Sequence, residues 1–130
     1  MKKLLTTLLL SLTFLIGFAQ EAVYAQASTL KIGVKNTRTG DFIWNNPIFV
    51  EGVYIKITKT TVDISSQTPQ HYTIYSESED VNGYDATFWY SYDLSGQRCR
   101  LYLIQNDVGD DFLAIEYNDY AWIYGLIDVK

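Results

Sequence analysis

Few side chains in this sequence have the chemistry of a nucleophile, a general base or a soft metal ligand. There is one histidine, His71, and one cysteine, Cys99. No aspartate or serine stands at a spacing that ties His71 to a nucleophile, and its outward parity predicts a surface residue. Cys99 has inward parity in its own strand, which predicts a buried and inert thiol. We therefore expect no catalytic residues, no metal centre built on cysteine and histidine, and no cofactor.

Acidic and amide side chains gather in two segments, 77–85 and 106–111, and supply oxygen ligands of the kind that Ca²⁺ takes. Neither segment matches a calcium-loop spacing such as D-x-D-x-D-G, so both are interpreted as solvated turns. A carboxylate pair for glycoside hydrolysis is not singled out either. An enzyme is the function class that the sequence favours least.

Aromatic side chains are the most abundant candidates, with 11 tyrosines, three tryptophans and six phenylalanines. Buried phenolic oxygens need hydrogen-bond partners, so many inward tyrosines predict that one end of the interior is open to water. The inward residues expected to bind a ligand are Tyr90, Tyr92, Tyr117, Trp122 and Tyr124. The outward residues expected to form an interaction surface are Tyr54, Tyr75, Trp89 and Tyr102.

The elements that position these residues follow an N-terminal export signal. Two lysines precede an apolar run that ends at Phe18, and Ala19 is a small residue of the type found at a cleavage site. Residues 1–19 are thus predicted to be a signal peptide, with an alternative cleavage after Ala25. The apolar run is shorter than the roughly 20 residues that span a bilayer, and no cysteine follows for lipid attachment. We expect an exported protein, periplasmic or extracellular, without a membrane anchor.

The rest of the chain has the length of one domain. Residues 20–29 show no clear period and are predicted to be a flexible lead-in to a single β-domain, residues 30–130. Removal of the signal peptide leaves eight basic against 15 acidic residues, a net charge near −7. Such a chain has little to neutralise phosphates, so a nucleic-acid partner is not expected.

The segment 86–104 is predicted to be the central β-hairpin of the domain. Two runs rich in aromatic and aliphatic residues flank a four-residue loop, 94–97, in which a glycine can adopt positive φ. A loop of this length places Tyr92 opposite Cys99 on the inward face. It also directs Trp89 outward.

Hydrophobic parity assigns three further loops. Two-residue turns at 59–60 and 118–119 and a five-residue loop at 106–110 each keep the apolar side chains on one face. The expected opposite pairs are Ile57 with Val62, Ile55 with Ile64, Leu103 with Leu113, Leu101 with Ile115, Tyr117 with Tyr120, Ile115 with Trp122, and Leu113 with Tyr124. The pairing of residues 30–50 is not assigned.

These hairpins predict an all-β fold, an antiparallel meander of about seven or eight strands. Closure into a small barrel is favoured over a two-layer sandwich, because a long flat sheet would leave exposed edges. In strand order, loop length and aromatic interior, residues 53–127 resemble the small exported barrels of the lipocalin-like, or calycin, kind. The chain lacks the glycine two residues before a tryptophan that opens that family, since Gly40 and Trp44 stand four apart. The resemblance implies binding of a small apolar ligand inside a barrel.

Two hypotheses of function follow. The first is a barrel that binds a small apolar or aromatic ligand in an aromatic-lined interior. The second is a protein-interaction module, of the inhibitor or immunity type, whose acidic face and surface aromatics meet an unidentified protein partner. The location of the aromatic side chains in the fold separates the two.

Overall fold

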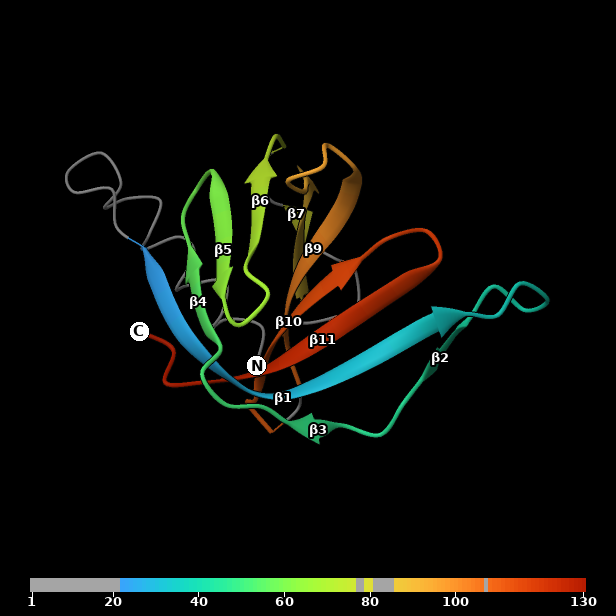
Figure 1. Cartoon of the computed structure of the whole chain (residues 1–130), viewed down its shortest axis with the longest axis horizontal. Helices are drawn as coiled ribbons and strands as arrows, with labels where there is room; N and C mark the ends of the chain where they lie inside the picture. Colours follow the sequence, from blue (N-terminus) through green and yellow to red (C-terminus); the bar gives the residue numbers. More distant parts are fainter. Residues whose placement is uncertain (1–21, 77–78, 81–85, 107) are drawn as a thin grey trace.

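The computed structural model of the chain describes residues 22–76, 79–80, 86–106 and 108–130 (Figure 1). The expected signal peptide, residues 1–19, lies outside these ranges. Within them every regular element is a β-strand, and no helix long and apolar enough to cross a membrane occurs. The strands are β1 (Val23–Lys35), β2 (Phe42–Trp44), β3 (Ile48–Phe49), β4 (Tyr54–Ile57), β5 (Thr61–Ser65), β6 (Gln70–Ile74), β7 (Glu79–Asp80), β8 (Ala86–Tyr92), β9 (Arg98–Gln105), β10 (Asp111–Glu116) and β11 (Tyr120–Ile127).

Eight of the described strands close into an antiparallel barrel. They pair in the order β1, β4, β5, β6, β8, β9, β10, β11, and β11 pairs with β1 to complete the ring. Strands β2 and β3 add to the second half of β1, and β7 adds to β8. The prediction of an all-β closed barrel is confirmed, and closure removes the long open edges that a meander of this length would otherwise expose.

Strand β1 closes the barrel, and it begins at Val23, so residues 23–29 of the predicted flexible lead-in belong to a strand. Figure 1 shows it as a long curved strand, with β4 beside its first half and β2 beside its far end. The register with β11 shifts between Ala27 and Thr29, so one extra residue forms a β-bulge there. The bulge moves the inward positions from Val23, Ala25 and Ala27 to Leu30 and Ile32. This change of parity hides the strand period from sequence inspection.

Three predicted loops have the predicted register. Ile57 pairs with Val62, Leu103 pairs with Leu113, and Leu113 pairs with Tyr124. The backbone amide of Tyr117 donates to the carbonyl of Tyr120 across the last turn. All of these strands therefore keep their apolar side chains inside the barrel.

The central hairpin is shifted by one residue from the prediction. Asp93 pairs with Gln97 across a three-residue loop, with Gly96 at φ +80°, so Tyr92 lies opposite Arg98 instead of Cys99. Trp89 is consequently buried, and Tyr90 points outward with 39% of its surface exposed. The shift places the larger apolar ring in the core and leaves the tyrosine hydroxyl in water, which is the less costly arrangement.

The core fills the middle of the barrel. Its fully buried side chains are mainly aliphatic and come from β4, β5, β9 and β10. They include Ile55, Ile57, Val62, Ile64, Leu101, Leu113 and Ile115. Aromatic and polar side chains replace them towards the end of the barrel where the β5–β6, β8–β9 and β10–β11 connections lie. That end carries the candidate site.

Candidate ligand-binding site

A cavity of about 590 Å³ opens at this end of the barrel. The three connections just named supply its rim, and the second half of β1 supplies one wall. Its volume lies within the range of about 300–1,000 Å³ that is usual for small-molecule sites. The lining residues are Leu30, Ile32, Thr68, Pro69, Gln70, His71, Tyr72, Asp93, Leu94, Ser95, Tyr117, Tyr120, Trp122 and Tyr124.

Three aromatic rings lie against one another in this cavity. The ring centroids are 4.8 Å apart for Tyr117 and Tyr120, 5.7 Å for Tyr117 and Trp122, and 5.8 Å for Tyr120 and Trp122. The ring planes are inclined to one another by only 13° to 30°, so the three rings are nearly parallel. The turn at 118–119 and the alternation of β11 bring the three residues together. The indole nitrogen of Trp122 is buried and has no hydrogen-bond partner among the described residues.

A carboxylate stands beside this stack. The buried Tyr117 donates its hydroxyl proton to Oδ2 of Asp93 at 2.7 Å, and the amides of Ser95 and Gln97 both donate to Oδ1 at 2.9 Å. Burial acts to raise the pKa of Asp93, but these three hydrogen bonds outweigh it and lower the pKa below the ordinary value. Burial and the bond to this carboxylate raise the pKa of Tyr117. Asp93 is therefore ionised and Tyr117 neutral at neutral pH.

Gln70 connects two other tyrosines of the cavity. Its Nε2 donates to the hydroxyl of Tyr124 at 2.9 Å, and its Oε1 accepts from the hydroxyl of Tyr72. Burial raises the pKa of both tyrosines, so both stay protonated. The amide thus satisfies phenolic groups that would otherwise be costly to bury.

The cavity contains three of the five residues predicted to bind a ligand, Tyr117, Trp122 and Tyr124. The other two, Tyr90 and Tyr92, lie on the outer face of the barrel because of the shift in the central hairpin. Sequence reasoning missed Asp93 and Gln70 as site residues. The glycine three residues after Asp93 is the signal that could have identified this residue, because the spacing is typical of an aspartate that caps a loop, here at the rim of the cavity.

The outer aromatic row is a set of five rings on β8, β9 and the end of β6: Phe88, Tyr90, Tyr92, Tyr75 and Tyr102. Neighbouring centroids in the row are 4.5 to 6.2 Å apart. Two of the four residues predicted for an interaction surface, Tyr75 and Tyr102, belong to it. Tyr54 lies elsewhere, beside a small pocket that Tyr24 also lines, and the prediction of an outward Trp89 is wrong because that ring is buried.

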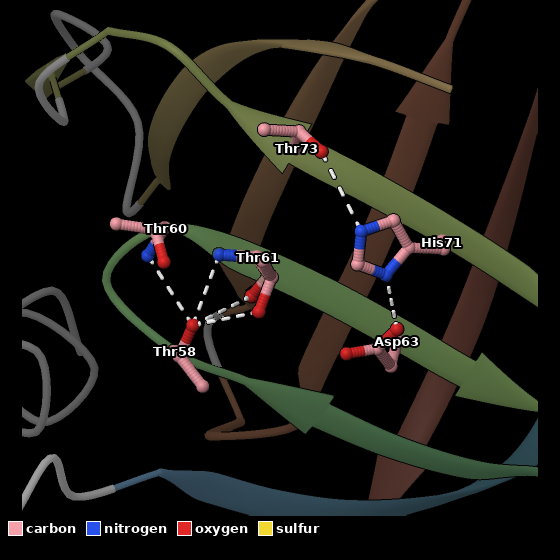
Figure 2. Close-up of polar contacts among 6 residues, drawn as sticks. All are labelled: Thr58, Thr60, Thr61, Asp63, His71 and Thr73. Carbon is pink, nitrogen blue, oxygen red and sulfur yellow. Dashed lines mark hydrogen bonds and ion pairs between the residues drawn. The ribbon is translucent and has the colours of Figure 1, made fainter. Parts of the chain in front are cut away.

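His71 lies at the surface on β6, as predicted, but has an acidic neighbour that sequence inspection missed. It stands opposite Asp63 on β5, and its Nδ1 contacts the Asp63 carboxylate, while its Nε2 is 3.5 Å from the hydroxyl of Thr73 (Figure 2). The pairing of β5 with β6 creates this contact, and the register of these two strands was not among those predicted from the sequence. Such an exposed pair contributes about 0–1 kcal/mol to stability.

Cys99 is buried opposite Ser91, whose Oγ is 3.1 Å from Sγ. Burial raises the pKa of the thiol, which keeps it in the unreactive protonated form. No group of three or more histidine, cysteine or acidic side chains able to hold a metal ion occurs in the part of the chain that the structure describes. The acidic segment 77–85 lies largely outside that part. Comparisons of the chain with protein-family models, with curated proteins and with solved structures found no match.

Proposed function

We propose that this protein is an exported binding protein, not an enzyme, and that it holds a small apolar or aromatic ligand in the mouth of its barrel. The observation that carries the proposal is the cavity of about 590 Å³ with the stacked rings of Tyr117, Tyr120 and Trp122 on its wall. Because Tyr117 is held by Asp93, the wall is largely formed before a ligand arrives, and binding needs little reorganisation.

Displacement and direct binding of a neutral apolar dye, N-phenyl-1-naphthylamine, test this proposal. Tyr120 and Tyr90 form a matched pair, because their exposed fractions are 40% and 39% but only Tyr120 lines the cavity. We expect one dye per chain, and we expect Tyr120→Ala to weaken binding by about tenfold, the loss of one aromatic contact. Tyr90→Ala should leave the affinity unchanged.

The control variants also decide what refutes the proposal. A dye that fails to bind, or that binds less well in Tyr90→Ala than in Tyr120→Ala, would contradict a site in the mouth. Trp44→Phe and Trp89→Phe leave Trp122 as the remaining tryptophan, so dye-dependent quenching in that double variant reports the cavity directly.

A second candidate function is a protein-interaction module that uses the outer aromatic row. The row favours it because contiguous surface aromatics, with Arg98 placed over the Tyr92 ring, are typical of protein interfaces. Native mass spectrometry of the protein from its own host distinguishes the candidates. A retained small molecule supports the cavity, and a retained protein released by Tyr90→Ala supports the row.

A further inference from the structure

The charge of the cavity points to a more specific class of ligand. Asp93 accepts three hydrogen bonds, and every donor is neutral: two backbone amides and the hydroxyl of Tyr117. No lysine or arginine occurs among the described residues that line the cavity. The basic side chain among the described lining residues is that of His71, and its ring is already in contact with Asp63. The carboxylate therefore brings a negative charge to the rim that the described lining does not neutralise.

The aromatic stack adds a second attraction of the same sign. The faces of Tyr and Trp rings carry negative electrostatic potential and attract a cation placed within about 6 Å of the centroid. Tyr117 belongs to both features, because its ring lies 4.8 Å from that of Tyr120 while its hydroxyl reaches Asp93. The side chain of Tyr117 thus connects the carboxylate to the stack, and a single ligand can contact both.

We propose that the ligand is an organic cation, a protonated amine or a quaternary ammonium with an apolar or aromatic body. Its charge lies beside the Asp93 carboxylate and the ring stack, and its body fills the apolar side of the cavity against Leu30 and Ile32. This inference rests on the proposed function and adds the sign of the ligand's charge. An anionic ligand of the same shape would meet repulsion at the rim and no compensating donor charge in the described lining.

A pair of ligands that differ only in charge tests the inference. Phenyltrimethylammonium and its neutral isostere tert-butylbenzene are each used to displace N-phenyl-1-naphthylamine from the full mature chain. We expect the cation to bind at least about tenfold more tightly than the isostere, in line with the value of one partly desolvated charge contact.

Asp93→Asn is the decisive variant, because asparagine keeps a carbonyl oxygen for the amides of Ser95 and Gln97 while it removes the charge. We expect it to abolish the preference for the cation, measured as the ratio of the affinities of the two ligands in the same variant. Asp110→Asn is the matched control, since it removes the same charge from the β9–β10 loop at the opposite end of the barrel. It should retain the preference.

The outcomes separate the two proposals. Equal affinities for the two ligands, or a preference that persists in Asp93→Asn, would overturn the cationic ligand and leave the apolar cavity standing. A loss of preference in Asp110→Asn would show that net charge acts at long range, which also contradicts the local role of Asp93. If neither ligand displaces the dye because the dye itself does not bind, the proposed function fails as well.

Discussion

Replacement of Tyr117 by phenylalanine tests the hydrogen bond that joins the aromatic stack to Asp93. Tyr117 is buried, with 4% of the residue exposed, so the substitution keeps the packing and removes one hydroxyl that donates at 2.7 Å to a carboxylate. A hydrogen bond to a charged group contributes about 1.5–3 kcal/mol. Because Asp93 is only half-buried and keeps two backbone donors, we expect the lower end, about 1.5 kcal/mol less free energy of unfolding at pH 7.

The pH dependence of this loss follows from the pKa of Asp93. Burial acts to raise that pKa, but the bonds from Tyr117 and the two amides lower it below the ordinary value of 3.8. A folded-state pKa below the unfolded one gives stabilisation that is complete above the unfolded pKa and is lost as the pH falls through the folded pKa. The difference between wild type and Tyr117→Phe should therefore be constant near neutral pH and shrink below about pH 4.

Urea unfolding followed by tryptophan fluorescence, repeated from pH 7 down to about pH 2, measures this difference. Tyr124→Phe is the matched control, because Tyr124 is equally buried but its hydroxyl bonds to the neutral amide of Gln70. It should lose about 0.5–1 kcal/mol at every pH. A loss in Tyr117→Phe that does not change with pH, or that equals the loss in Tyr124→Phe, would refute the role given to the carboxylate.

Three further predictions concern the barrel. A thiol reagent should label Cys99 in urea-unfolded protein and leave the native protein unlabelled, and rapid native labelling would contradict its burial. A chain that begins at Gln26 lacks the buried Val23 and Ala25 and should unfold with about 2–4 kcal/mol less free energy than one that begins at residue 20; equal urea midpoints would show that this part of β1 does not stabilise the closure. Gly96→Ala should cost about 1–2 kcal/mol, because φ is +80° and nothing lies within 4 Å of the added methyl group, so an unchanged midpoint would contradict the loop conformation.

The sequence predicts most of the register because short turns leave little freedom in how neighbouring strands pair. Between Ile57 and Val62 the inward parity changes from odd to even, and only an even number of turn residues is compatible with both strands. The turn at 118–119 works in the same way. In both cases a single apolar face decides the pairing, so parity alone is sufficient.

The central hairpin could not be predicted in this way because both faces of β8 are aromatic. Trp89 and Tyr90 are neighbours of comparable size, and a change of one residue in loop length exchanges their positions without exposing an obviously apolar face. The first half of β1 was hidden for a related reason, since the bulge at Ala27 breaks its period. The pairing of β1 with β4 and β11, which is long-range and cannot be read from the sequence, decides the course of that strand.

One local signal does specify the central loop. Asn106 accepts hydrogen bonds from the amides of Val108 and Asp110, and Asp93 accepts them from Ser95 and Gln97, in loops that each have a glycine three residues after the capping side chain. Residues 93–97 and 106–110 are therefore loops of the same length, each capped by the side chain of its first residue and each with its glycine at positive φ. A loop of the length predicted for 106–110, if placed at 93–97, gives the observed register of β8 and β9.

The capped loop also positions the candidate site. If the loop were one residue longer at the expense of β8, Trp89 would leave the core, and the capping bonds of Asp93 to Ser95 and Gln97 could not form in their present geometry. With the observed loop, Oδ1 of Asp93 is used by the backbone while Oδ2 is held at the hydroxyl of Tyr117. One aspartate thus fixes the register of the hairpin, orients the aromatic stack and brings the negative charge to the cavity. A preference for cations that disappears in Asp93→Asn with the fold intact would separate the last of these roles from the first two.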